Sequence, residues 1–176
     1  MTVNQATIDL IKKWEGFKSK AYRDAVNVWT IGYGTTAMAG VGIKPTAGMA
    51  ISEKEAEKYL RLGVDKFAAK IRPHITAPIN ENEFGAFVSL AYNIGPGAFI
   101  ESTALRRFND GDKMGAVEAL KWFNKAGGKQ MQGLANRRED EARLFLTPAP
   151  AKEHKPAPWW VGIIAAIAAL FGKGAK

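Results

Sequence analysis

Two carboxylates and one hydroxyl near the N-terminus have the types and spacing that glycoside chemistry requires. Glu15 follows an amphipathic segment, Asp24 stands nine residues later, and Thr30 follows after six more. Hydrolysis of a glycosidic bond uses two carboxyl groups that flank it: one protonates the leaving oxygen, and the other handles water or the sugar cation. A carboxyl at the end of a helix and a second in a neighbouring hairpin can face each other across a cleft.

The surroundings of these three residues favour distinct roles. Glu15 stands beside Trp14 and Phe17, and apolar surroundings favour the protonated form that a general acid needs. Asp24 has polar neighbours, so we expect it to remain ionised, with the Thr30 hydroxyl holding a water beside it. Each residue also has an ordinary explanation, as a solvated glutamate at a helix end, a turn aspartate or a strand threonine.

Hydrophobic spacing predicts the elements that position these residues. It predicts a helix over residues 4–14 and an antiparallel sheet of two or three strands after Gly16, with a loop at 37–50. A helix over 53–71, capped by Ser52 and stopped by Pro73, would be nearly 30 Å long and could join two lobes. Further helices are predicted at 80–92, 102–109, 113–124 and 133–146, with a turn at 93–97 and a loop at 126–128.

The pattern E-x8-D-x5-T, with WEGF around the glutamate and IGYG after the threonine, resembles the phage-type lysozymes, or endolysins, of the T4 lysozyme superfamily. Two later segments resemble the C-terminal lobe of that family in the same order: SLAYNIGPGAFIESTALRRFNDGD (89–112) and KWFNKAGGKQMQGLANRREDEARLF (121–145). The resemblance covers residues 5–146. It implies an α+β, lysozyme-like fold with a small N-terminal β-containing lobe and a larger helical C-terminal lobe, joined by a long helix.

The resemblance also implies an activity. It implies hydrolysis, with inversion, of the β-1,4 bond between N-acetylmuramic acid and N-acetylglucosamine in bacterial peptidoglycan, leading to lysis of the host cell. Glu15 would be the acid, and Asp24 and Thr30 would hold the attacking water. Arg137 matches an arginine that faces the glutamate across the cleft. Because a nearby cation favours the carboxylate form, we expect Arg137 to orient Glu15 and tie the lobes together, unless it is a surface arginine.

Three more residues are expected to support the substrate. Asn93 and Gly95 would shape the far wall of the cleft, and Tyr33 would stack on a sugar. A turn explains the glycine equally well, and core packing is the default for the tyrosine.

Two other functions stay open at this point. A lytic transglycosylase of related fold uses one glutamate and lets the sugar's own hydroxyl attack, so Asp24 and Thr30 would be superfluous. A non-catalytic module that binds the wall or disrupts membranes would need none of the three residues.

Composition bounds the class of protein and its partners. The chain has 176 residues, of which 47% are hydrophobic, enough for one well-packed domain. It has no cysteine, so disulfides and thiolate nucleophiles are excluded. His74 and His154 stand alone, and we expect neither a metal nor a cofactor. The net charge of +8 suits polyanions; with the resemblance, we expect a monomer that binds peptidoglycan glycan strands and no nucleic acid.

The two ends of the chain predict where it acts. Polar residues interrupt the N-terminal apolar pattern, so we expect synthesis in the host cytoplasm without a signal peptide. The resemblance implies action at the wall, after release through a holin pore or by the tail. Residues 1–146 would form the muramidase domain and the proline-rich 147–158 a linker. We expect 159–176, apolar with a basic end, to contact the bacterial membrane as a helix. Docking on the enzyme and self-association are the alternatives.

Overall fold

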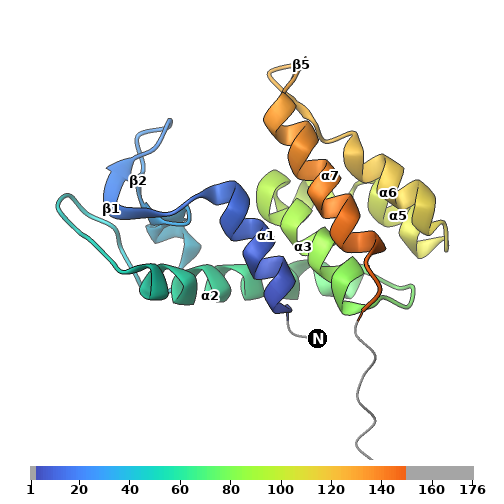
Figure 1. Ribbon diagram of the computed structural model, residues 1–176, viewed down its shortest axis with the longest axis horizontal. Helices are drawn as coiled ribbons and strands as arrows, with labels where there is room; N and C mark the ends of the chain where they lie inside the picture. The colour runs from blue at the N-terminus through green and yellow to red at the C-terminus, as the bar shows by residue number, and fades with distance from the viewer. Residues whose placement is uncertain (1–2, 150–176) are drawn as a thin grey trace, which may run out of the picture.

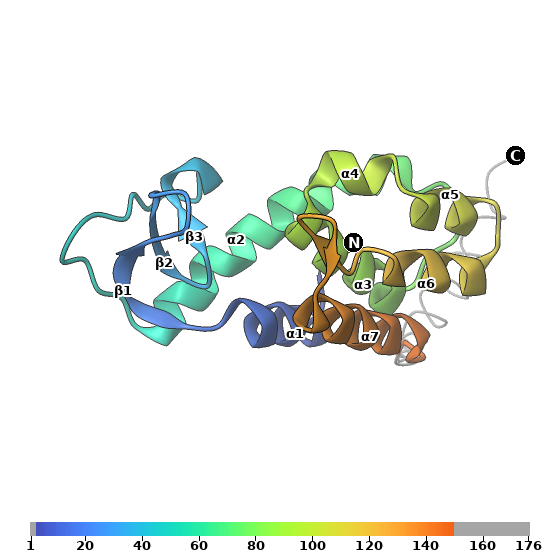
Figure 2. The ribbon, with the colours of Figure 1, turned by 90° about the horizontal axis from the view of Figure 1, so that it is seen from above.

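A long helix, α2 (Glu53–Ile71), runs from a small lobe that contains a β-sheet to a larger lobe built of helices (Figures 1 and 2). The computed structural model describes residues 3–149. Most of the predicted linker and the predicted apolar helix at 159–176 lie outside the described residues. The two-lobed α+β arrangement is as the sequence predicted, and α2 has the predicted bounds.

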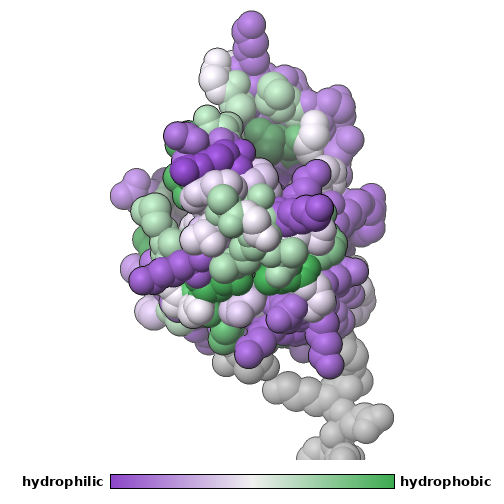
Figure 3. Space-filling view, turned by 90° about the vertical axis from the view of Figure 1, so that its left-hand side faces the viewer, coloured by the Kyte–Doolittle hydropathy of each residue, from purple (hydrophilic) through white to green (hydrophobic). Residues whose placement is uncertain are grey.

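The small lobe is a three-stranded antiparallel sheet in the order β1-β2-β3. Its elements are β1 (Lys18–Arg23), β2 (Trp29–Gly32), β3 (Thr35–Thr36) and the short 3-10 helix η1 (Ala37–Ala39). In the register of the sheet, Thr30 on the central strand pairs with Tyr22 and with Thr36. Seen from this end of the molecule, hydrophilic side chains surround smaller apolar areas (Figure 3). Asp24 directly follows β1 and Thr30 lies on β2, so one short hydrogen-bonded hairpin carries both residues.

The large lobe is organised around α3 (Glu81–Ile94), which is buried along most of its length. Phe87 of α3 packs against three other phenylalanine rings at centroid distances of 5.1 to 5.3 Å. In chain order the remaining elements of the lobe are α1 (Gln5–Glu15), η2 (Arg72–His74), α4 (Pro96–Ile100), α5 (Thr103–Asn109), α6 (Lys113–Lys121), β4 (Lys125–Ala126), β5 (Lys129–Gln130) and α7 (Gln132–Leu146).

Side-chain caps begin the helices where the sequence predicted them. Ser52 and Glu55 form a capping box at the start of α2, and Asn80 and Glu83 form a second at the start of α3. Each box satisfies backbone N–H groups that the first helical turn leaves free. The local sequence thus determines where the helix that joins the lobes begins.

One glycine allows α2 to lie directly against the sheet. Gly32 has a φ of +68°, and a Cβ at this position would stand 2.9 Å from the Cβ of Ala56 in α2. Both the left-handed backbone and the close approach require glycine here. The contact fixes the sheet on the helix that carries the floor of the cleft.

Asn82 joins the two ends of the described chain. This buried side chain accepts a hydrogen bond from Asn4 Nδ2 at 2.7 Å, just before α1. It also donates to the carbonyl oxygens of Thr147 and Pro148, at 3.0 and 3.2 Å, just after α7. The start of α1 and the end of α7 are therefore held at the same place.

Two predictions about the large lobe were wrong in detail. The segment 93–97, predicted as a turn, contains the break between α3 and the additional helix α4, because Pro96 suits the first turn of a helix, where its missing N–H costs nothing. The residues after Lys121 form a small hairpin instead of extending α6 to residue 124. No helix among residues 3–149 is long and apolar enough to cross a membrane.

Candidate active site

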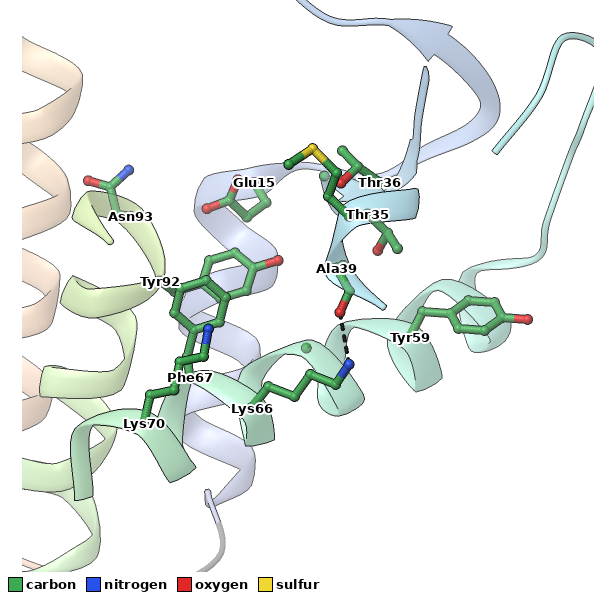
Figure 4. A pocket seen from close by; sticks show the side chains of 13 residues that line it. Glu15, Thr35, Thr36, Ala39, Tyr59, Lys66, Phe67, Lys70, Tyr92 and Asn93 are labelled. Carbon is green, nitrogen blue, oxygen red and sulfur yellow. Dashed lines mark hydrogen bonds between the residues drawn. The ribbon is translucent and has the colours of Figure 1, made fainter. Parts of the chain in front are cut away.

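A pocket of about 450 Å³ lies between the lobes and contains Glu15 in its wall. Its lining comes from the end of α1, from β3 and η1, from one face of α2, and from the end of α3 (Figure 4). Since both lobes contribute, a ligand in this pocket would contact the sheet and the helical lobe together. No three His, Asp or Glu side chains within residues 3–149 gather closely enough to hold a metal ion.

Glu15, at the end of α1, is held by Arg137 of the neighbouring helix α7. Arg137 Nη1 donates to Glu15 Oε1 at 2.9 Å, and the arginine side chain is 5% exposed against 23% for the glutamate. The other carboxylate oxygen, Oε2, lies 3.6 Å from where a Cβ on Gly34 would stand. The predicted pairing of Arg137 with Glu15 is present in the structure: one oxygen is engaged, and the other lies on the side of Gly34. The expectation that the pair ties the lobes together was wrong, because α1 and α7 both belong to the large lobe.

A buried ionic cluster fixes Arg137 in turn. Glu141 Oε1 accepts hydrogen bonds from Arg137 Nε at 3.2 Å, from Arg138 Nη2 at 3.0 Å and from the Ser89 hydroxyl at 2.8 Å. Arg138 Nε lies 2.9 Å from Glu141 Oε2, within ion-pair range but out of the alignment that a hydrogen bond requires. Burial raises the pKa of Glu141, which the two guanidinium groups oppose, and burial lowers the pKa of Arg138. Sequence reasoning did not identify this cluster.

The hairpin presents Asp24 with one oxygen fixed and one available. Asp24 Oδ1 accepts from the backbone N–H groups of Val26 and Val28 at 3.0 and 2.8 Å. Thr30 Oγ1 lies 3.1 Å from the Val28 carbonyl oxygen and 3.4 Å from Asp24 Oδ2. A hydroxyl has one proton, and the carbonyl is the nearer acceptor, so Oδ2 keeps its capacity to accept from water. The structure brings Asp24 and Thr30 together, although neither lines the pocket that contains Glu15.

Tyr33 does not stack over the pocket as a substrate residue would, and the default of core packing holds for it. Tyr33 is buried, its hydroxyl donates to Glu53 Oε1 at 2.6 Å, and burial raises its pKa. It packs against Phe17, with ring centroids 5.6 Å apart, and does not line the pocket. Tyr92, near the end of α3, lines the pocket beside Phe67, with ring centroids 5.0 Å apart. Burial, and next the Glu15 carboxylate, raises the pKa of Tyr92.

Of the two residues predicted to form the far wall, one lines the pocket. Asn93 lines it, and its Oδ1 accepts from Arg138 Nη2 at 3.0 Å. Gly95 does not; with a φ of +91° it ends α3, as the turn explanation requires. Sequence reasoning also missed Lys66 and Lys70, which line the pocket from α2. The available signal was their spacing, since each follows another lining residue, Gly63 or Phe67, by three residues and the two lysines are four apart.

Comparison with known proteins agrees with this fold and arrangement. The sequence matches the phage lysozyme family over residues 12–141. It is 43% identical over 150 residues to the endolysin of Bacillus phage B103, covering 84% of this chain and 55% of that protein. It is 36% identical over 149 residues to the endolysin of Acyrthosiphon pisum secondary endosymbiont phage 1, covering 82% of this chain and 98% of that one. The chain thus spans little more than half of the Bacillus phage protein.

A solved structure supports the same conclusion. The endolysin of Escherichia coli O157:H7 phage FAHEc1 superposes with a TM-score of 0.75 at 40% identity, covering 86% of this chain and 98% of that one. The fold is therefore the lysozyme-like α+β fold that the sequence predicted. The chain belongs to the phage lysozyme family.

Proposed function

We propose that this chain hydrolyses the β-1,4 bond between N-acetylmuramic acid and N-acetylglucosamine in bacterial peptidoglycan, in the course of host cell lysis. The observation that carries the proposal is the pairing of Glu15, in a pocket between the lobes, with the buried Arg137. Membership of the phage lysozyme family supports the same substrate. In the proposal, Glu15 and Asp24 are the two carboxyl groups that glycoside hydrolysis needs.

In this proposal Glu15 is the general acid. Arg137 occupies Oε1, so Oε2 carries the proton to the leaving oxygen of the sugar. The guanidinium alone favours the charged carboxylate. Entry of the glycan removes water from the pocket and favours the protonated form, so substrate and arginine act on Glu15 in opposite directions.

Asp24 and Thr30 position the attacking water. The Thr30 proton points to the Val28 carbonyl, which leaves the hydroxyl oxygen free to accept one proton of a water, while Asp24 Oδ2 accepts the other. Attack by this water on the face opposite the leaving group inverts the anomeric carbon. An inverting enzyme is expected to keep its two carboxyl groups about 6.5–9.5 Å apart, whereas a nucleophilic Asp24 would need about 5–5.5 Å and would give retention.

The test is Glu15→Gln, an isosteric change that removes the transferable proton. We expect clearing of purified peptidoglycan to fall by at least about a hundredfold with the fold intact. Near-normal activity in the folded variant would refute the assignment of Glu15 and favour a non-catalytic wall-binding module. NMR of the first product reports the stereochemistry. Anhydro-muramic ends would instead identify a lytic transglycosylase.

We also propose that residues 159–171, outside the described residues, bind the bacterial membrane through an apolar helix that lies after the linker 147–158. The support is their apolar sequence, with two tryptophans at one end and lysines at the other. Deletion of 150–176 should leave hydrolysis of purified peptidoglycan intact and abolish flotation with anionic liposomes. Equal flotation of both forms would assign membrane affinity to the basic catalytic domain, residues 1–146.

The proposal places synthesis in the host cytoplasm and action at the wall, after release through a holin pore or by the tail. The protein is expected to act as a monomer.

A further inference from the structure

Two lysines on α2 form the wall of the pocket that faces Glu15. Lys66 and Lys70 are the only charged residues besides Glu15 in the lining that residues 3–149 provide. In Figure 4 both rise from α2, whereas Glu15 lies across the pocket at the end of α1. Within the described part of the chain, neither lysine has a carboxylate in ion-pair range. Their charges are therefore available to a ligand.

The ammonium group of Lys66 is fixed in place. Its Nζ donates to the carbonyl oxygens of Ala39 and Gly40, at 3.0 and 2.5 Å. Gly40 has a φ of +62°, and a Cβ at this position would stand 2.9 Å from Nζ. An ammonium group has three donors, so one remains for a ligand. A side chain that is ordered beforehand loses less entropy when it binds.

The face of α2 between the lobes is open beside the lysines. Tyr59, Gly63, Lys66, Phe67 and Lys70 recur at three- and four-residue steps and all line the pocket, as one face of a helix should. A Cβ on Gly63 would meet only Val41, at 4.0 Å, so packing does not require glycine there. Glycine inside a helix costs about 1 kcal/mol relative to alanine. Its missing side chain leaves room in the floor of the pocket.

We propose that Lys66 and Lys70 form a subsite for the carboxylates of the branch that peptidoglycan carries on N-acetylmuramic acid. This inference rests on the proposed function. The disaccharide repeat is otherwise uncharged; its carboxylates lie on the lactyl group or on the peptide attached to it. Ammonium groups one helical turn apart can bind such carboxylates through charge-assisted hydrogen bonds. The subsite would select glycan with anionic branches over uncharged polysaccharide.

The experiment compares purified peptidoglycan with the same material after its carboxylates are converted to primary amides. Release of reducing ends gives KM and kcat for the wild type, for Lys66→Gln combined with Lys70→Gln, and for Lys58→Gln. Lys58 is an exposed lysine of α2 outside the pocket, so its variant has lost one positive charge at a site without this role. We expect the double variant to raise KM on native peptidoglycan about tenfold, as two partly exposed ion pairs allow.

The same reasoning predicts KM for the other combinations of variant and substrate. On amidated peptidoglycan the double variant should match the wild type, whose own KM should be about tenfold higher there than on native material. Lys58→Gln should behave as the wild type on both. Because Lys66→Gln also removes two hydrogen bonds to the small lobe, Lys66→Arg serves as the variant that keeps the charge and should retain a low KM.

Several outcomes would overturn the subsite. An equal rise in KM on both substrates would make the lysines structural, and an equal effect of Lys58→Gln would show general attraction between a basic protein and the wall. Strands stripped of peptide by an amidase carry a lactyl carboxylate that the amide bond to the peptide had masked. Loss of the lysine effect on these strands assigns the peptide carboxylates, and a persistent effect shows that the freed lactyl carboxylate also binds the subsite. If the wild type cleaves peptidoglycan but the lysine variants are unaffected, the subsite fails and the proposed function stands.

Discussion

Glutamine in place of Glu141 should destabilise the fold more than any exposed charge change. Glu141 has no exposed surface and lies within 3.2 Å of both Arg137 and Arg138. The substitution keeps the shape and one acceptor oxygen but removes the negative charge, which leaves Arg138, itself fully buried, without a carboxylate partner among the described residues. Removing one member of a buried ion pair costs about 3–5 kcal/mol. At about 2–4 °C per kcal/mol for a chain of this size, Tm should fall by about 6–20 °C.

The matched control is Glu57→Gln. Glu57 is 28% exposed and pairs with Lys12 and Arg61 at 2.8 Å each. Partly exposed pairs are worth less than about 1 kcal/mol, so this variant should lose only a few degrees. Calorimetry and urea unfolding at neutral pH measure both proteins. A Glu141→Gln protein whose Tm falls no further than that of the control would refute the claim that the cluster is a tightly coupled, dehydrated ionic core.

Two further predictions concern the backbone and the dependence on pH. Gly32→Ala should destabilise the protein in urea by about 2 kcal/mol or more, and by more than Gly42→Ala, because Gly42 has a φ of +90° but nothing within 4 Å of an added Cβ; equal losses would mean that contact with α2 does not require glycine. Burial raises the pKa of Asp140, but ion pairs with Lys13 and Arg143 outweigh it and lower the pKa overall. The ionised Asp140 therefore stabilises the fold above about pH 4, the usual pKa of aspartate, and this stabilisation is lost as pH falls through the lowered pKa. The difference in unfolding free energy between wild type and Asp140→Asn should be full at about pH 6 and shrink below about pH 4. A difference that is constant with pH would contradict this.

Local sequence was sufficient wherever a local interaction decides the structure. The capping boxes at Ser52 and Asn80 and the apolar steps through α2 and α3 act within a few residues, and the predicted helices begin where those signals stand. The spacing of Asp24 and Thr30 likewise falls within one hairpin, and the structure brings the two side chains together.

Other features depend on contacts between distant segments, which no local pattern encodes. A buried cluster of Arg138 and Glu141 reads in the sequence as a charged, solvated helix face. Lys66 and Lys70 read as the solvent side of α2, and only the position of the small lobe over that face makes it a pocket wall. Tyr33 does not continue the alternating strand that the sequence predicted, because β2 ends at Gly32, whose positive φ turns the chain.

The hydrogen bonds of Asn82 determine where on this domain another domain can be attached. Its hydrogen bonds hold Asn4 and the carbonyls of Thr147 and Pro148 on one side chain, so the chain enters and leaves the domain at a single point. The eleven residues of α1 separate that point from Glu15 by about 16 Å. A second domain fused to either end of this domain would therefore be attached to the helical lobe and would leave the cleft accessible. The same adjacency makes the domain suited to circular permutation, in which a short linker joins the old ends and new ones open elsewhere.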